Sequence, residues 1–571
     1  MTNPDIAAVL DEIADLLEFK GSNPFRIRAY RNAARTIHDL PESVAQIVAD
    51  ADRRLTDIKG IGKDLAEKLA LLVETGSIPM LDELLAEIPQ SVLAILRVPG
   101  LGPKRAAVLY NELSVTTLDE LREACESQQV RELKGFGAKT EETILQGLEI
   151  ASEADRRILW AEADQHALAI FTHLRDCTAV DRLEVAGSYR RGKETVGDLD
   201  FLAVAADANR VMDHFADYND LADVLLRGDT KMSIRLSGGL QIDLRVVPAE
   251  SFGAALQYFT GSQAHNVALR GLAKERGLKI NEYGVFRGEQ SIAGSTEEDV
   301  YAALDLPVFP PELREARREF DWAAAGELPR LVEMDDILGD LHAHSTFSDG
   351  LATLEEMAEA AKARGLKYLA ITDHSKRVAM AGGLDARRLR QQWAEIDALN
   401  RRLSGIKLLK GVEVDILEQG DLDLDDGVLA EADWVVASIH YGQNQSGEQI
   451  TSRVIGALEN PFVSAIAHPT GRMLMRRKPY EIDMEAVLRA ARDHGKAMEL
   501  NAHPMRLDLD DIGCAAAKNH GVPVVISTDA HRTDGLDAMR FGVQQARRGG
   551  LTKEDVANTR SWAQLKKMIG R

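Results

Sequence analysis

Three aspartates in two apolar runs of the sequence could hold divalent cations. Asp198 and Asp200 are two residues apart in DLDFLAVA, and Asp243 lies in LQIDLRVV. Side chains two residues apart in a strand leave the same face, so the first two carboxylates share one face while Leu199 and Phe201 are buried on the other. If the two strands are neighbours, three carboxylates converge, which is costly unless cations neutralise them. We therefore predict a Mg²⁺ pair that supports two-metal phosphoryl transfer.

The segment GSYRRGKETVGDLD, which leads into the first run, strengthens this prediction. Taken alone, an exposed Asp-x-Asp on an edge strand is the commoner explanation of such a pair. Here a Gly-Ser turn and Arg191 precede it and supply amide, hydroxyl and guanidinium donors for a triphosphate. The combination favours a nucleotidyl-transfer site.

A second set of metal-binding side chains follows residue 336, where nine of the 14 histidines lie. Apolar, strand-like runs in this part repeatedly end in a histidine or a carboxylate. The carboxyl ends of strands line one site in parallel β/α folds, so side chains that are far apart in the sequence can meet there. The candidate ligands are His342, His344, Asp349, His374, Glu413, His440, His468, Asp529 and His531.

The composition of this set indicates which metals it would bind. One histidine after a strand is usually packed or hydrogen-bonded, but six histidines and three carboxylates at the same topological position need another explanation. Imidazole mixed with carboxylate suits Mn²⁺, Zn²⁺ or Fe²⁺ better than Mg²⁺, and nine ligands imply two or three ions. Asp373, Asn501 and His503 are either groups that orient these ligands or structural residues.

Gly-x-Gly turns recur three times in the first 150 residues, which otherwise read as successive helices. Each turn has a Lys within three residues after it. Main-chain amides and a helix N-terminus in such a turn can hold a phosphate. A single copy could equally be a helix C-cap, but three copies favour contact with the DNA backbone. The glycine pairs are Gly60 and Gly62, Gly100 and Gly102, and Gly135 and Gly137.

Composition limits the kind of protein that carries these groups. The 571 residues are 45% hydrophobic and have a net charge of −22, from 69 Lys and Arg against 91 Asp and Glu. This excludes disorder and argues against coating nucleic acid with bulk positive charge. The three cysteines form no CxxC pair, the N-terminus lacks the basic region of a signal peptide, and no apolar run could span a bilayer. We expect a cytoplasmic protein with reduced thiols and no membrane partner.

The first 320 residues or so resemble X-family DNA polymerases, the polymerase beta group. The resemblance rests on GSYRRGKETVGDLD, on Asp243, on YFTGS at 258–262 and on NPFRIRAYR near the N-terminus. It implies that Asp198, Asp200 and Asp243 are the catalytic metal ligands of a nucleotidyltransferase palm. The nucleotide contacts that it implies are Ser188, Arg191 and Gly197 at the triphosphate, Tyr258, Phe259 and Gly261 at the sugar, and Asn266 and Arg270 on the minor-groove side of the nascent pair.

Three positions depart from the family pattern or qualify it. Gln241 stands where eukaryotic members carry an Arg that positions the primer end, and His265 replaces an aromatic residue beside the nucleotide base of the animal enzyme. Lys68 matches the Schiff-base lysine that removes a 5′ deoxyribose phosphate. That reaction needs an amine with a lowered pKa, and we favour the alternative of a solvated helix lysine beside Glu67.

The histidine-rich part resembles the PHP (polymerase and histidinol phosphatase) domain, a β/α barrel with a trinuclear metal centre. Every ligand position that can be placed is filled, whereas several are replaced in related polymerases that have lost the activity. A polymerase core joined to a PHP barrel is typical of bacterial X-family DNA polymerases. The predicted parts are a helical lyase-like domain with the first helix-hairpin-helix at 1–85, a helical fingers-like DNA-binding subdomain at 86–152, an α+β palm at 153–248, a thumb at 249–316, a linker at 317–336 and the barrel at 337–571.

The function implied is the filling of short gaps in damaged DNA, as in base excision repair, with Mg²⁺ in the polymerase site and Mn²⁺ or Zn²⁺ in the barrel. The barrel would hydrolyse phosphodiesters, in 3′–5′ exonuclease action, 3′-end processing or abasic-site cleavage. The expected partners are gapped or nicked DNA with a primer terminus, deoxynucleoside triphosphates and other repair proteins. Two alternatives are a small-molecule phosphatase tethered to DNA by the N-terminal half, and a non-catalytic scaffold whose metals only stabilise the barrel.

Overall fold

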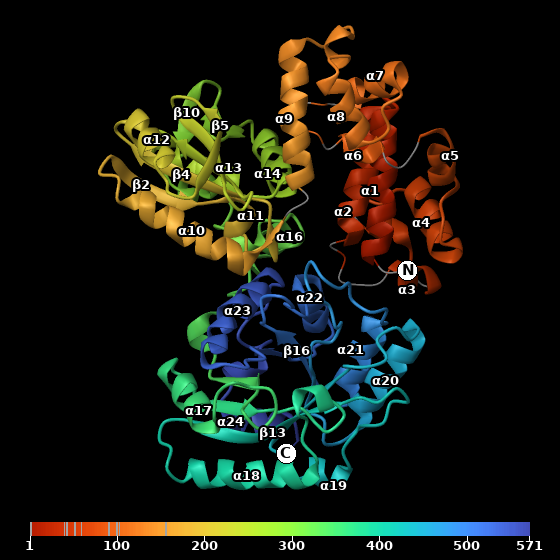
Figure 1. The fold of residues 1–571 in the computed structure, drawn as a ribbon, viewed down its shortest axis with the longest axis vertical. Coiled ribbons are helices and arrows are strands. Elements are labelled where there is room, and N and C mark those ends of the chain that lie inside the picture. Colours follow the sequence, from red (N-terminus) through yellow and green to blue (C-terminus); the bar gives the residue numbers. More distant parts are fainter. Residues whose placement is uncertain are drawn as a thin grey trace. The chain divides into compact units, whose positions relative to one another are not determined.

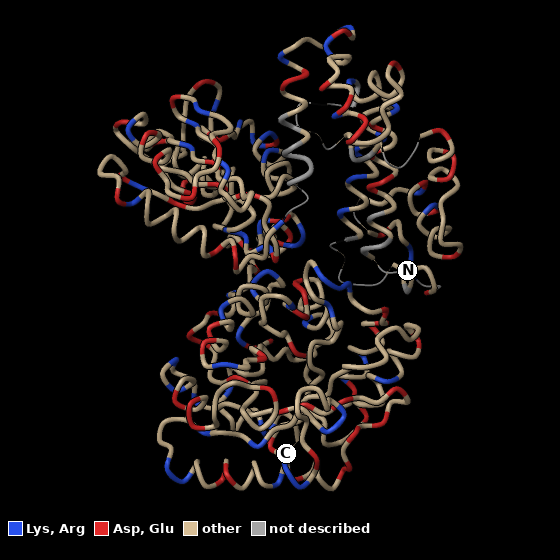
Figure 2. Tube along the Cα trace, viewed as in Figure 1, with Lys and Arg blue, Asp and Glu red and all other residues tan. Residues whose placement is uncertain are grey.

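The chain forms two compact units, Met1–Arg157 and Ile158–Arg571 (Figure 1). The computed structural model describes residues 3–38, 40, 44–50, 53–58, 60–88, 92–96, 98, 101, 103–154 and 157–570. Lys and Arg are interspersed with Asp and Glu along both units (Figure 2). In the described part of the chain, no helix combines the length and the apolar composition that crossing a membrane requires.

The described part of the first unit is helical and has one hydrophobic core, which includes Leu10 at its start and Leu148 near its end. Local signals set the helix ends. Thr117 and Glu120 form a capping box at the start of α8, and Gly76 ends α4 in the left-handed conformation. The helices are α1 (Asn3–Phe19), α2 (Pro24–His38), α3 (Val44–Ala49), α4 (Lys63–Thr75), α5 (Pro79–Glu87), α6 (Val92–Leu96), α7 (Pro103–Leu113), α8 (Leu118–Glu126) and α9 (Ala138–Ala154).

The second unit begins with a five-stranded sheet that carries the aspartates. Its strands, in spatial order, are β2 (Val180–Val185), β4 (Asp198–Ala205), β7 (Gln241–Val246), β6 (Lys231–Leu236) and β5 (Leu221–Arg227). The pair β4 and β7 is parallel, and the other neighbours are antiparallel. One face packs on α10 (Trp160–Arg175) and α12 (Ala208–Ala216), where Leu199 and Phe201 are fully buried as the alternation predicts. The other face packs on α13 (Phe252–Thr260).

A smaller α+β layer follows this sheet. It contains α14 (Gln263–Glu275), the three-stranded antiparallel sheet of β8 (Lys279–Asn281), β9 (Gly284–Arg287) and β10 (Gln290–Ala293), and α15 (Glu297–Ala302). Phe320 of α16 (Glu319–Ala325) packs against the hydrophobic core of this layer. The core therefore extends into the stretch predicted as a linker, 317–336.

The C-terminal part is a nearly closed barrel of seven parallel strands in sequence order. They are β11 (Gly339–Ala343), β12 (Tyr368–Ile371), β13 (Lys407–Asp415), β14 (Trp434–Ser438), β15 (Ala465–Ile466), β16 (Ala497–Asn501) and β17 (Val524–Ser527). The first and last strands approach each other where the His344 amide donates to the Ala530 carbonyl, at 2.8 Å. Alternate residues of the strands enter two cores, so that Leu409 and Ala497 lie in one and Leu408 and Met498 in the other. The fold predicted for this region is confirmed.

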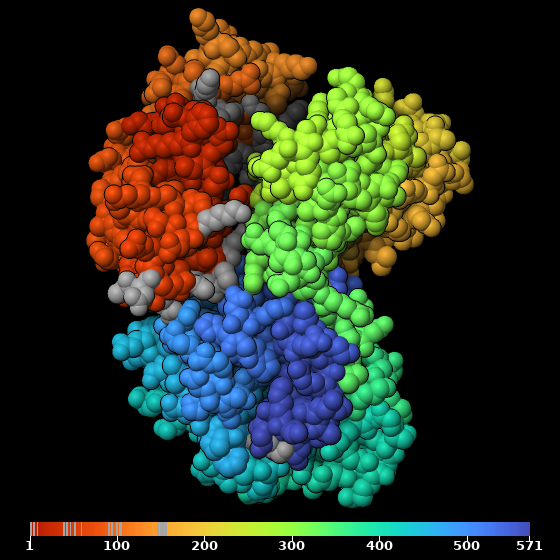
Figure 3. Space-filling model, turned by 180° about the vertical axis from the view of Figure 1, so that it is seen from behind, coloured from red at the N-terminus to blue at the C-terminus, as the bar shows by residue number. Residues whose placement is uncertain are grey.

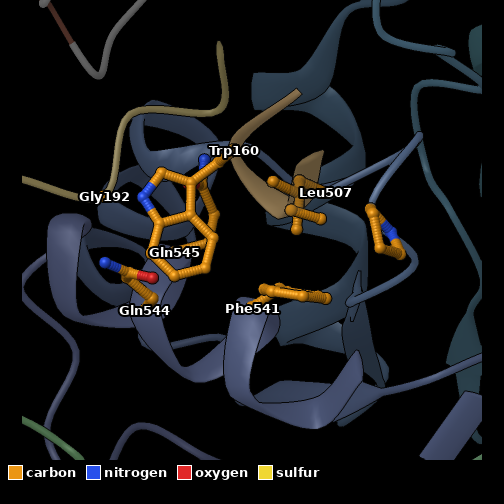
Figure 4. A pocket seen from close by; sticks show the side chains of 8 residues that line it. Trp160, Gly192, Leu507, Phe541, Gln544 and Gln545 are labelled. Atoms are coloured by element: carbon orange, nitrogen blue, oxygen red, sulfur yellow. The ribbon is translucent and has the colours of Figure 1, made fainter. Parts of the chain in front are cut away.

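Buried ion pairs join the barrel to the sheet within the second unit. Arg548 of α23 (Met539–Arg548) donates to the backbone carbonyl of Arg191 at 2.8 Å and pairs with Glu315 at 3.1 Å and Asp511 at 2.6 Å. Near this junction Trp160, Leu507 and Phe541 line a small cavity of about 10 Å³ (Figure 4). Seen from behind, the green surface around residue 300 adjoins the blue surface of the last hundred residues (Figure 3).

Candidate active sites

The strand register brings the predicted aspartates together. Asp200 on β4 is the direct partner of Asp243 on β7, and Asp198 is the partner of Gln241. Asp198 is exposed, Asp200 is half-buried and Asp243 is 8% exposed. The three carboxylates therefore occupy the amino ends of two adjacent parallel strands. Hard oxygen ligands so arranged suit Mg²⁺.

The electrostatics of this group also fit bound cations. Burial raises the pKa of Asp200 to about 7, and the negative charges of Asp198 and Asp243 add to this effect. The chain approaches Asp200 closely at Gly187, which has a φ of +67°. A Cβ at Gly187 would lie 2.4 Å from Asp200 Oδ2, so no larger residue fits there without displacing the carboxylate.

Gln241, where the family pattern has Arg, interacts with the aspartates. Its Nε2 donates to Asp243 Oδ1 at 2.8 Å, and Lys231 Nζ lies 3.3 Å from Asp243 Oδ2. In the absence of cations, one amide and one ammonium group thus partly balance this carboxylate.

The candidate triphosphate contacts surround the same strand. Ser188 lies on the short helix α11 (Gly187–Arg190), and Gly197 is exposed directly before Asp198. Arg191 is engaged within the protein, because its Nε donates to Glu315 at 3.0 Å and a terminal nitrogen donates to the Thr260 carbonyl at 2.8 Å.

The candidate sugar contacts Tyr258 and Phe259 lie in the last turn of α13, which ends at Thr260, directly before Gly261. Asn266 supports them from α14, since its Nδ2 donates to the Tyr258 carbonyl at 2.7 Å, whereas Arg270 is exposed. His265, which replaces an aromatic residue of the animal enzyme, lies in the protein core. Its ring is fully buried, stacked on Phe320 and 2.8 Å from Glu319, in the core that continues past the predicted thumb.

All nine candidate ligands of the barrel lie at the carboxyl ends of its strands. Two are on strands, His342 on β11 and Glu413 on β13, and the others are in the segments that follow strands. Three groups have ligand atoms within 4.8 Å of one another. They are His344 with Asp349, His374 and His531; His342 with His344 and Asp529; and His374 with Glu413 and His440. His468 joins them through Nε2, which lies 3.0 Å from Glu413 Oε1.

Unpartnered buried atoms support metal binding by this set. Among the described residues, fifteen buried side-chain atoms lack a hydrogen-bond partner, and four of them are in the candidate set: His342 Nε2, His344 Nδ1, His374 Nδ1 and Glu413 Oε2, of which the last two lie 2.7 Å apart as an ion pair. Such atoms are costly unless a ligand satisfies them. These four residues belong to groups of closely spaced ligand atoms that overlap, so the site fits divalent cations, and three overlapping groups fit two or three ions.

Charges within the set are balanced by protonation when no cation is present. Burial lowers the pKa of His374, but Glu413 and Asp349 outweigh burial and raise it to about 10. Burial lowers the pKa of His344 to about 4, and His374 and His531 contribute in the same direction. Imidazolium charges thus take the place of metal charges among the carboxylates.

Sequence reasoning missed two carboxylates that orient the ligands. Glu499 Oε1 on β16 lies 2.7 Å from His342 Nδ1, and Asp415 Oδ1 on β13 lies 3.0 Å from His440 Nδ1. Such partners fix the ring and its tautomer. The signal that could have found them is an acidic residue on a strand whose neighbours are all apolar.

The three residues left open between two roles differ in the structure. Asn501 Nδ2 donates to Asp529 Oδ2 at 3.1 Å and thus contacts a candidate ligand. Asp373 instead accepts hydrogen bonds from the Ser345 amide and hydroxyl. The His503 ring accepts from the Met505 amide at 3.2 Å.

A cavity of about 470 Å³ opens over the ligand cluster. Besides ligands, it is lined by Arg506, whose Nε lies 3.7 Å from Asp529 Oδ2. A cation beside the ligands is well suited to hold a phosphate oxygen.

The Gly-x-Gly turns in the described part of the chain have open surroundings. Gly60 and Gly135 take positive φ, +94° and +90°, and a Cβ at Gly62 or Gly137 would meet nothing within 4 Å. Each turn leads into a helix, α4 or α9, whose first amides have no partner within that helix. Gly100 and Gly102 lie outside the described residues.

Lys68 on α4 forms an ion pair within its own helix. Its Nζ donates to Asp64 at 2.5 Å. Burial lowers the pKa of Lys68, but the hydrogen bonds and charges of Asp64 and Tyr30 outweigh it, and the net pKa is raised.

Comparisons with known proteins cover almost the whole chain. Sequence models of five domain families match: a helix-hairpin-helix domain at 1–78, a SAM-like helix-hairpin-helix tandem at 92–149, a DNA polymerase beta palm at 157–234, a DNA polymerase beta thumb at 255–315 and a PHP domain at 340–503. The DNA polymerase/3′-5′ exonuclease PolX of Bacillus subtilis is 41% identical over 575 residues, which is 100% of both chains. A probable phosphatase of Thermoanaerobacter sp. is 32% identical over 232 residues, 38% of this chain and 89% of the relative.

Proposed function

Because the chain belongs to the bacterial X-family DNA polymerases with a PHP domain, we propose that it fills short gaps in DNA and that its barrel trims 3′ ends. The observation that carries this proposal is the presence of two complete ligand sets in one chain, three aspartates on adjacent strands and nine side chains at the mouth of a barrel. Gap filling needs a clean 3′-hydroxyl, so the two activities serve one reaction sequence. A phosphatase of small phosphoesters would not require the aspartates or the hairpin turns.

In the palm, Asp198, Asp200 and Asp243 hold two Mg²⁺ ions. Ions held by these carboxylates would supply the Lewis-acid chemistry that activates a primer 3′-hydroxyl and neutralises the leaving pyrophosphate. Ser188 and Arg191 bind the triphosphate, and Arg191 exchanges its contact with Glu315 for one with a phosphate oxygen. The other proposed contacts are Gly197, Tyr258, Phe259, Gly261, Asn266 and Arg270.

In the barrel, the nine ligands would hold two or three Mn²⁺ or Zn²⁺ ions, and the chemistry that these ions would supply is the activation of water and the neutralisation of a phosphodiester. Arg506 holds a phosphate oxygen, and Glu499 and Asp415 keep the His342 and His440 rings in place. The Gly60–Gly62 and Gly135–Gly137 turns bind the DNA backbone through main-chain amides.

A single-nucleotide gapped duplex tests both activities on one substrate. We expect the double variant Asp198→Ala/Asp200→Ala to lose extension and keep 3′-end degradation. His344→Ala should lose degradation in Mn²⁺ and keep extension in Mg²⁺. Extension by the double variant would overturn the polymerase assignment. Unchanged degradation by His344→Ala, or no degradation by the parent protein, would overturn the nuclease assignment.

A further inference from the structure

The cavity over the barrel's ligand cluster is lined in part by residues that are not needed to bind a phosphate. Besides the ligands and Arg506, its lining residues are Val378, Met380, Ala381 and Tyr441. Charged ligands and Arg506 suffice for a phosphodiester, whereas three aliphatic side chains and a phenol ring suit an apolar, planar group. The wall therefore indicates a substrate with such a group next to its phosphate.

Tyr441 is a fixed aromatic surface beside the metal ligands. It directly follows His440, and the Arg377 guanidinium lies 5.1 Å from the centre of its ring. Arg453, only 2% exposed, donates to the Tyr441 carbonyl at 3.1 Å and to the Gly442 carbonyl at 3.3 Å. These contacts hold the backbone of Tyr441, and the Arg377 guanidinium lies against its ring, which reduces the ordering that an occupant would impose.

Met380 lies on a second fixed segment of the same wall. It is 96% exposed in the short turn Ala379–Ala381. The segment is closed where the Leu384 amide donates to the His374 carbonyl at 2.7 Å and Arg388 donates to the Gly382 carbonyl at 2.7 Å. A large, polarisable side chain is thus held in solvent at the edge of a charged site, where an aromatic ligand would cover it.

We propose that Tyr441 and Met380 form a nucleobase subsite for the 3′-terminal nucleotide whose phosphodiester lies at the ligand cluster. This rests on the proposed nuclease function of the barrel. Every base has a planar face that stacks on an aromatic ring, so the subsite tolerates any sequence. The cavity of about 470 Å³ is within the size range of sites for nucleotide-sized ligands.

Two oligonucleotides with the same sequence test the subsite on the full-length, Mn²⁺-loaded protein. One ends in a 3′ thymidine nucleotide and the other in a stable baseless tetrahydrofuran nucleotide. Stacking on one aromatic residue corresponds to about tenfold in kcat/KM. We expect the parent protein to prefer the thymidine end by about that factor. Tyr441→Ala should remove the preference by raising KM for the thymidine end alone, and Tyr441→Phe should retain it.

Two further variants separate base stacking from damage to the metal site, since Tyr441 adjoins His440. Met380→Ala should also reduce the preference, with unchanged metal content. Met334→Ala, an exposed methionine outside the cavity lining, should not. The subsite is rejected if the parent protein shows no preference, or if Tyr441→Ala and Met380→Ala slow both substrates equally. Failure of the parent protein to degrade either oligonucleotide would instead reject the nuclease function on which the subsite rests.

Discussion

Asp200 and Asp243 lie directly opposite each other on the parallel strands β4 and β7. Their surroundings differ, because Gln241 and Lys231 contact Asp243, while Asp200 is buried beside two other carboxylates. Without cations, the fold therefore holds Asp200 partly in its neutral form near neutral pH.

The stability of the metal-free protein should reflect this arrangement. The pKa of Asp200 is about 7 in the folded state and 3.8 ordinarily, so its carboxylate opposes folding increasingly as the pH rises from 3.8 to 7. Asp200→Asn removes that cost. At pH 8 we expect the free energy of unfolding of Asp200→Asn to exceed that of the parent protein by a few kcal/mol, and its melting temperature to be higher. At pH 4 the two proteins should differ little. The measurement is calorimetry in EDTA. Mg²⁺ should reduce the difference in unfolding free energy between the variant and the parent protein at pH 8. If Asp200→Asn stabilised the protein equally at pH 4 and pH 8, the explanation would be contradicted.

Glu499→Gln should weaken metal binding in the barrel without unfolding it. The amide keeps the size of the side chain but loses the charge that orients His342. Loss of such a partner typically costs about 10–100-fold in metal affinity or activity. The measurement is Mn²⁺ titration of 3′-end degradation. Glu395→Gln, a change of the same kind at an exposed position of α18 (Ala386–Asn400), should leave the titration unchanged.

Lys68 should form little covalent adduct with a 5′ deoxyribose phosphate at neutral pH. Asp64 and Tyr30 raise the pKa of its amine, which keeps it protonated. Borohydride trapping measures the adduct. Asp64→Asn should increase trapping, and Lys68→Ala should abolish the increase. Strong trapping by the parent protein that Lys68→Ala removes would show that the lysine acts despite its ion pair.

Gly62→Ala and Gly137→Ala should weaken DNA binding several-fold without loss of stability. Neither position needs a positive φ, and a Cβ at either meets nothing within 4 Å of the protein. The new methyl group would meet only the approaching DNA backbone. The measurement is equilibrium binding to gapped duplexes of different sequence. Each variant should lose the same factor in affinity for every duplex. Gly238→Ala is the control, because Gly238 lies between β6 and β7 and a Cβ there also meets nothing within 4 Å. This variant should bind DNA like the parent protein.

Much of the palm and barrel follows from local pattern, because period-two alternation fixes which face of a strand each side chain occupies. The alternation predicted the burial of Leu199 and Phe201. In the barrel, the histidines and carboxylates at the ends of apolar runs predicted the ligand cluster. Contacts between distant segments could not be predicted in this way. Glu315 holds Arg191 across 124 residues, and Glu499 holds His342 across 157. The burial of His265 could not be predicted either, because its ring stacks on Phe320, outside the predicted thumb.

The contacts of Arg548 and Arg472 with the turn around Arg191 bear on how the gene could be divided. Arg548 donates to the Arg191 carbonyl, and Arg472 pairs with Glu194 at 2.5 Å. A chain cut between palm and barrel would leave these arginines on one fragment and their partners on the other. Arg548 would keep its pair with Asp511, and Arg472 its pair with Asp510, but both would lose their contacts with the turn. Neither fragment would inherit a finished surface, so a working division of the gene would need new contacts on the cut face of each fragment.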